Sequence, residues 1–242
     1  MLKKQAQRKR HRGRTISGRR KRGIEVEVFH GPPLGPGMET ADLATVMAAL
    51  ERFDPIMPWT QAQGRVLPML PRIRPLPVSE LDLARTMLPP GILVGFGIDL
   101  GPALTFVSTT LLERWQVDHS ALAQAALANV RRLADSCGRN RVVGDHIAGV
   151  PVRILQSRVG IAASLLLAPD RLERFFGPGP LLLLAPMRDL LIALPADVDR
   201  ELAAWLAEEW EALDPNHLHL GGFRYERGVV IPEPLDEALG RA

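Results

Sequence analysis

The feature that most constrains the fold is an apolar block at residues 181–195 that holds only two charges. Two apolar runs of four to six residues, bounded by prolines, flank the short segment Met187-Arg188-Asp189. Runs this short are typical of buried strands, because a buried helix needs about 10 to 12 residues. We therefore predict two buried strands joined by a tight hairpin turn at residues 187–189.

The two charges in this turn, Arg188 and Asp189, fit two interpretations. Asp is common in turns because its side chain bonds to nearby backbone, so both residues can belong to a solvated hairpin turn. Alternatively, charges at the edge of a core are often paired, which makes Arg188 and Asp189 an ion pair at the rim of a pocket. On the second interpretation these two residues are the candidate ligand-binding residues.

Length and composition limit the class of protein. The chain of 242 residues is 46% hydrophobic, enough for one sizeable core or two small ones. No apolar stretch reaches the roughly 18–20 residues of a membrane span, and the basic N-terminus lacks the apolar segment of a secretory signal. We therefore expect a cytoplasmic protein with no membrane partner. The single cysteine, Cys137, excludes an intramolecular disulfide and a zinc site with two thiolates.

The charge is distributed unevenly along the chain. Residues 1–23 hold eleven of the 30 Lys and Arg residues and no acid, whereas the remaining chain has 19 basic and 27 acidic residues. Such a run cannot form a core, so we predict a disordered arm that can bind phosphate backbones without reading sequence. It has no aromatic residue for stacking on bases. The candidate nucleic-acid-binding residues are Arg8, Lys9, Arg10, Arg12, Arg14, Arg19, Arg20, Lys21 and Arg22.

We divide the chain into three parts on these grounds. Residues 1–37 comprise the basic arm and a Gly/Pro linker, residues 38–232 a single α+β domain, and residues 233–242 a flexible tail. A start codon assigned upstream by mistake also explains the first part. Met38 directly precedes a predicted helix, and all four lysines of the chain lie before it.

Hydrophobic periodicity and turn residues predict the order of the elements. Strand pairs are repeatedly followed by a helix, which favours an α+β fold with an antiparallel sheet built from hairpins and helices packed on one face. The segment 162–167 is apolar and is compatible with either a strand or a helix. We predict helices at 40–53, 79–87, 109–115, 118–136, 169–176 and 197–213, and strands at 65–70, 92–98, 103–107, 141–148, 150–155, 181–186 and 190–195, with a last hairpin at 223–231.

Six short segments, taken in order and spacing, carry a family resemblance. They are GFGID at 95–99, LTFV at 104–107, LERW at 112–115, AALANV at 125–130, ASLLL at 163–167 and APMRDLL at 185–191. The region that they span, roughly residues 60–210, resembles the YtpQ-like family of uncharacterised bacterial proteins. The resemblance implies an α+β fold and a bacterial cytoplasmic setting, but no activity and no catalytic residue. The basic arm and the region after residue 213 depart from it.

Other candidate sites have weaker signals. His217 and His219 form the one His-x-His in the chain, which could share a metal if it lay in a strand, but no third ligand is evident nearby. His119 and His146 each lie near a carboxylate, and Ser164 lacks a nucleophile elbow. We therefore assign no catalytic residue, no metal and no cofactor.

These observations leave three functions open. The first is a non-catalytic binding or regulatory module with a groove near Met187-Arg188-Asp189 and an unidentified ligand or protein partner. The second is a hydrolase-type enzyme that uses Asp189 and a histidine. The third is a nucleic-acid-associated protein that acts through residues 1–23.

Overall fold

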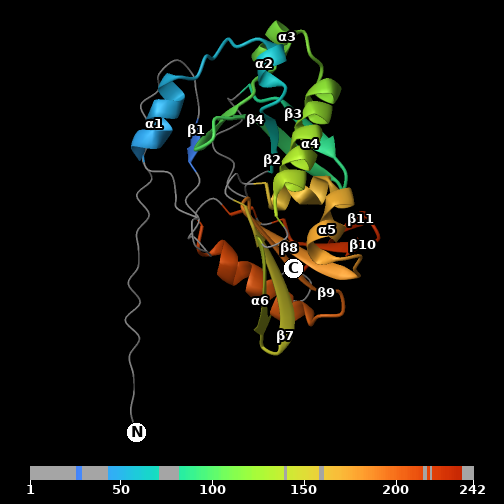
Figure 1. The fold of residues 1–242 in the computed structure, drawn as a ribbon. Helices are drawn as coiled ribbons and strands as arrows, with labels where there is room; N and C mark the ends of the chain where they lie inside the picture. The colour runs from blue at the N-terminus through green and yellow to red at the C-terminus, as the bar shows by residue number, and fades with distance from the viewer. Residues whose placement is uncertain are drawn as a thin grey trace.

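The computed structural model contains two antiparallel sheets with helical segments packed against them (Figure 1). The α+β class predicted from the sequence is thereby confirmed. The structure differs in having two sheets where the sequence suggested one. It describes residues 26–28, 43–70, 82–138, 141–157, 161–214, 217–218 and 220–235.

The five-stranded sheet has the order β1-β5-β4-β2, and β3 pairs with β4. The second half of β4 pairs with β2 and its first half pairs with β3, so this strand organises the sheet. The predicted hairpin between β4 and β5 forms, and Gly101 supplies the positive φ in its turn. The strands are β1 (Val26–Val28), β2 (Val66–Met69), β3 (Arg85–Leu88), β4 (Ile92–Asp99) and β5 (Ala103–Phe106).

The six-stranded sheet has the order β11-β10-β8-β9-β7-β6 and consists of three hairpins, all of them predicted. The hairpin β8–β9 occupies its centre. The pairing register shifts between Leu184 and Met187, which accommodates Pro186 because proline has no N–H for the ladder. The strands are β6 (Val142–Ile147), β7 (Val150–Gln156), β8 (Leu181–Met187), β9 (Leu190–Pro195), β10 (Gly222–Glu226) and β11 (Val229–Glu233).

The two long helices begin at aspartates that cap them. The Asp118 carboxylate accepts a hydrogen bond from the Ala121 N–H at 2.7 Å, and the Asp199 carboxylate accepts one from the Leu202 N–H at 3.0 Å. The ambiguous segment after residue 161 is a buried 3₁₀ helix, η3. The helices are α1 (Leu43–Glu51), α2 (Trp59–Ala62), α3 (Thr109–Trp115), α4 (His119–Ser136), η3 (Ala163–Leu167), η4 (Pro169–Arg171), α5 (Leu172–Phe176) and α6 (Arg200–Glu211).

Both faces of the β8–β9 hairpin are buried, each in its own hydrophobic cluster. On β8, Leu181 and Leu183 belong to a large cluster that also contains η3, α4 and the five-stranded sheet. Leu182 and Leu184 belong to a smaller cluster beneath α6. Where the sequence suggested helices on one face, this sheet carries helical segments on both. A strand buried on both faces has no need of polar residues at alternate positions, which explains the unbroken leucine run.

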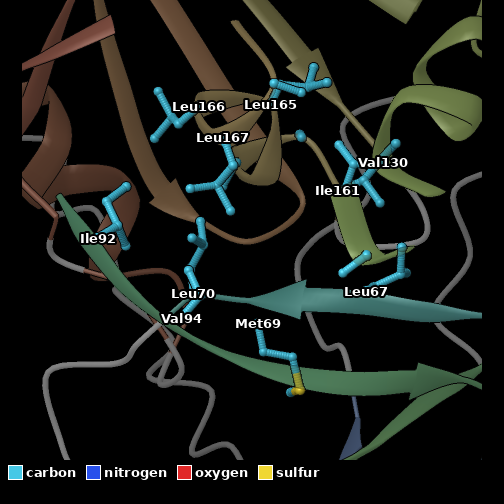
Figure 2. Packing of buried hydrophobic residues seen from close by; sticks show 14 of the residues in the cluster. Leu67, Met69, Leu70, Ile92, Val94, Val130, Ile161, Leu165, Leu166 and Leu167 are labelled. Atoms are coloured by element: carbon cyan, nitrogen blue, oxygen red, sulfur yellow. The ribbon is translucent and has the colours of Figure 1, made fainter. Parts of the chain in front are cut away.

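The large cluster connects the two sheets. Figure 2 shows side chains from β2, β4 and α4 packed together with those of η3, which lies in the connection between β7 and β8 of the six-stranded sheet. Residues from positions 57 to 230 contribute to this one cluster. The core therefore cannot be divided at the boundary between the sheets. The residues labelled in the figure are Leu67, Met69, Leu70, Ile92, Val94, Val130, Ile161, Leu165, Leu166 and Leu167.

Two sequence predictions about local structure need correction. The predicted helix at 79–87 is wrong for its described part, because Arg85–Leu88 form β3, and Arg85 lies opposite Gly95 of β4. Pairing with a distant strand here outweighs the local helical pattern. The predicted disordered arm and linker at 1–37 is interrupted by β1, in which Val26 lies opposite Thr105 of β5. The rest of that segment, like Thr40, lies outside the described residues.

The two glycines of β4 provide a matched test of this packing. A Cβ on Gly97 would lie 2.6 Å from the buried Met69 sulfur and 3.0 Å from the Thr105 carbonyl oxygen, whereas a Cβ on Gly95 would approach no atom closer than 3.9 Å. We expect Gly97→Ala to lower the free energy of unfolding by about 1–3 kcal/mol, because overpacking displaces neighbours. Gly95→Ala should change it by less than about 0.5 kcal/mol. Urea denaturation of both variants would show this, and equal effects would contradict the packing described.

Candidate functional site

The turn between β8 and β9 is buried, so the solvated-turn interpretation is wrong. Arg188 is only 8% exposed and Asp189 is partly buried. A buried arginine requires partners for its charge and its donors, since an uncompensated charge in a core is costly. The surroundings of these two residues therefore decide what the turn can do.

The Arg188 side chain joins the two sheets. Its Nη2 donates a hydrogen bond of 2.9 Å to the carbonyl oxygen of Leu70, which directly follows β2 of the five-stranded sheet. Burial lowers the pKa of Arg188 to about 10, against the attraction of the nearby Asp214 carboxylate, which raises it. Arg188 remains charged at neutral pH and lies between a backbone acceptor and a buried acid.

Asp189 shares the neighbour Asp214 with Arg188 but differs in its hydrogen-bond partner. Burial raises the pKa of Asp189 to about 6, and the nearby Asp214 charge raises it further, whereas a hydrogen bond from the Gln156 side chain lowers it. The Arg188–Asp189 pair suggested by the sequence is thus replaced by two sets of contacts. Arg188 bonds to Leu70 and Asp189 bonds to Gln156, and both side chains lie near Asp214.

Backbone hydrogen bonds hold three further segments against the turn. Ser157 N–H donates to the Asp189 carbonyl at 2.8 Å, Ala163 N–H to the Arg188 carbonyl at 3.1 Å, and Leu218 N–H to the Pro186 carbonyl at 2.9 Å. Most of the buried polar residues in the described chain belong to this turn or to the segments that meet it. They are Gln156, Ser157, Ser164, Arg188 and Asp214.

The turn has the chemistry of a possible proton acceptor. A carboxyl group with a pKa of about 6 can exchange a proton near neutral pH. His217 lies in the segment that meets the turn, and its Nδ1 is 3.1 Å from the Asp214 carbonyl oxygen. In contrast, His119 and His146 are exposed at the start of α4 and on β6.

A metal site is not formed by the described residues, in which no group of three His, Cys, Asp or Glu side chains comes together. His219, which forms with His217 the His-x-His considered for a shared metal, lies outside the described residues. The nine candidate nucleic-acid-binding residues between Arg8 and Arg22 also lie outside them. Ser164 is described, and it is buried in η3, 3% exposed.

A partly open apolar pocket lies at the other end of η3 from the hairpin turn. Its volume is about 270 Å³. Ala163, the first residue of η3, bonds to the turn, whereas Leu166 and Leu167 at its end form part of the pocket wall. The described lining residues are Leu88, Pro89, Pro90, Leu127, Arg131, Leu166, Leu167, Pro169 and Val230.

Arg131 is the one charged side chain among the described lining residues, and it belongs to a chain of ion pairs at the pocket rim. Its Nε lies 3.2 Å from both carboxylate oxygens of Asp170. Asp170 also pairs with Arg171 at 2.7 Å, and Arg171 reaches Asp135 at 2.9 Å. Arg174 completes the chain at 3.5 Å from Asp135. These pairs connect α4 to η4 and α5.

No pattern in the sequence indicates this pocket. Its walls come from the β3–β4 turn, α4, η3, η4 and β11, which are far apart in the chain. Leucines and prolines in such segments have the same local pattern whether they line a cavity or fill a core. Arg131 and Asp170 are 39 residues apart in the chain, and this separation does not indicate that they form an ion pair.

Comparisons with protein-family models, with curated proteins and with solved structures found no match. The resemblance to the YtpQ-like family therefore stays a prediction. In the part of the chain that the structure describes, no helix is long and apolar enough to cross a membrane.

The buried position of Arg188 predicts a large effect of its removal. Arg188→Met should lower the free energy of unfolding by about 3–5 kcal/mol, because it removes the buried cation beside Asp214 and the donor to the Leu70 carbonyl. Arg224 is exposed on β10, so Arg224→Met should cost less than about 0.5 kcal/mol. Urea denaturation measures both values. Similar values for the two variants would show that Arg188 does not join the sheets.

The raised pKa of Asp189 predicts a pH-dependent stability. Because the folded pKa of about 6 exceeds the ordinary 3.8, the contribution of this group is fully present below about pH 4 and is lost as the pH rises through about 6. Asp189→Asn removes this loss. The variant should gain about 2–3 kcal/mol relative to the wild type between about pH 4 and pH 7, measured by urea denaturation at each pH. A constant difference across this range would contradict the assignment.

Proposed function

We propose that the protein is a non-catalytic binding or regulatory module whose ligand enters the apolar pocket between the β3–β4 turn, α4, η3 and η4. The observation that carries this proposal is the composition of the pocket wall. Apart from Arg131, the described lining residues are Leu, Pro and Val. Such a wall binds an apolar group by removing it from water, but it offers no nucleophile and no proton acceptor.

The hairpin turn supports the pocket in this proposal and does not itself contact the ligand. Arg188 and Asp189 were the candidate ligand-binding residues, yet Arg188 is buried against Leu70. Through its carbonyl, Arg188 fixes the start of η3 at Ala163, and the end of η3 forms the pocket wall. Arg188 therefore positions the pocket wall through the backbone and does not line it.

We further propose membership of the YtpQ-like family on the six segments described above. Two of them contribute to the pocket and its support. The segment AALANV contains Leu127, and ASLLL is η3 itself. The family resemblance supports a cytoplasmic bacterial setting and leaves the ligand to be determined from the pocket.

The pocket itself can be tested with a small neutral probe. Saturation-transfer NMR should detect binding of 1-hexanol to the wild-type protein. Leu127→Trp should weaken that binding by roughly tenfold or more, because the indole fills the pocket. Ala128→Trp is the matched control, since Ala128 is the exposed neighbour on the same helix. Equal binding to both variants, or no binding to the wild type, would refute the proposal.

A further inference from the structure

We infer that the ligand of this pocket is a small amphiphilic carboxylate, with its apolar group inside the pocket and its carboxylate on the guanidinium of Arg131. This inference rests on the proposed function and adds the chemical class of the ligand. The pocket volume, the geometry of Arg131 and the charge of the rim support it independently.

The volume limits the apolar part of the ligand. The pocket volume is about 270 Å³. It is larger than a cavity of about 150 Å³ that holds benzene, and slightly smaller than the sites for drug-sized ligands, whose volumes are about 300–1,000 Å³. One aryl group or one short alkyl chain fits this space. Because the pocket is partly open, the polar end of such a ligand lies at the rim, beside Arg131.

Arg131 presents donors that its ion pair does not use. The contacts with Asp170 involve Nε, and the described residues accept no hydrogen bond from the two terminal amino groups. A guanidinium carries five N–H donors in a planar fork, so one carboxylate on the Nε side leaves donors for another. The side chain is 39% exposed, and a ligand at the pocket mouth can therefore reach it.

The charge of the rim favours an anion with a single charge. Three arginines and two aspartates form the chain of ion pairs, so one positive charge is in excess. A hydrogen bond to Asp135 raises the pKa of Arg171. Asp170 pairs with both Arg131 and Arg171, so the two arginines share its charge. Since Arg131 is the one cation in the described wall, it matches a carboxylate better than a doubly charged phosphate.

The experiment compares hexanoate with 1-hexanol, which have the same chain length and differ in charge. Dissociation constants are measured by NMR titration of the full chain at about pH 7.5, where hexanoate is ionised. Hexanoate should bind about three- to fivefold more tightly than 1-hexanol, the range expected for a partly exposed ion pair. About 0.5 M NaCl should reduce this preference through screening.

Variants of α4 then test whether Arg131 provides the preference. Arg131→Gln should bind both probes equally, and Arg131→Lys should retain part of the preference for hexanoate. Arg132→Gln should behave as the wild type, because Arg132 donates to the Gly64 carbonyl and is not among the lining residues. A preference that survives in Arg131→Gln would overturn the role of Arg131.

The possible failures are distinguishable. If the wild type binds both probes with equal affinity, the pocket binds apolar groups and the carboxylate inference is overturned. If the wild type binds neither probe, the proposed function fails and the inference fails with it. A preference for hexanoate that is lost in Arg131→Gln and retained in Arg132→Gln supports both.

Discussion

The fold depends on burying both faces of the β8–β9 hairpin. Its strands are apolar at every position, so the free energy of folding favours cover on each side. On one face α6 provides that cover, and on the other η3 and the large cluster do. The same requirement brings the five-stranded sheet into the shared core. The central hairpin of the six-stranded sheet thus lies between α6 on one face and the large cluster on the other.

Burying this hairpin also buries its turn, so the charged side chains of Arg188 and Asp189 lie largely away from solvent. Arg188 and Asp214 compensate one another, and the Leu70 carbonyl occupies an arginine donor. An apolar pair of similar size could hold the sheets together as well. A charged pair, however, requires a particular geometry of its partners. Here Leu70 directly follows β2 of the five-stranded sheet, and Asp214 lies between α6 and β10. The turn therefore fixes how the sheets meet, and it fixes η3 through Ala163.

The position of η3 connects this structural role to the proposed binding role. Its first residue is held by the hairpin turn and its last two line the pocket. The ion pair between Arg131 and Asp170 connects α4 to η4 at the pocket rim. The elements that line this partly open pocket are thus held by contacts outside it, which favours a pocket that is formed before a ligand binds.

The sequence alone determined the elements whose signals are local. The three hairpins of the six-stranded sheet follow from short apolar runs and turn residues, and α4 and α6 follow from their helical periodicity. Tertiary structure alone decided the rest. It made a strand of residues 85–88, placed Arg188 against Leu70 and Asp214, and assembled the pocket around Arg131. These features depend on contacts between segments far apart in the chain, and such contacts leave no pattern in the local sequence.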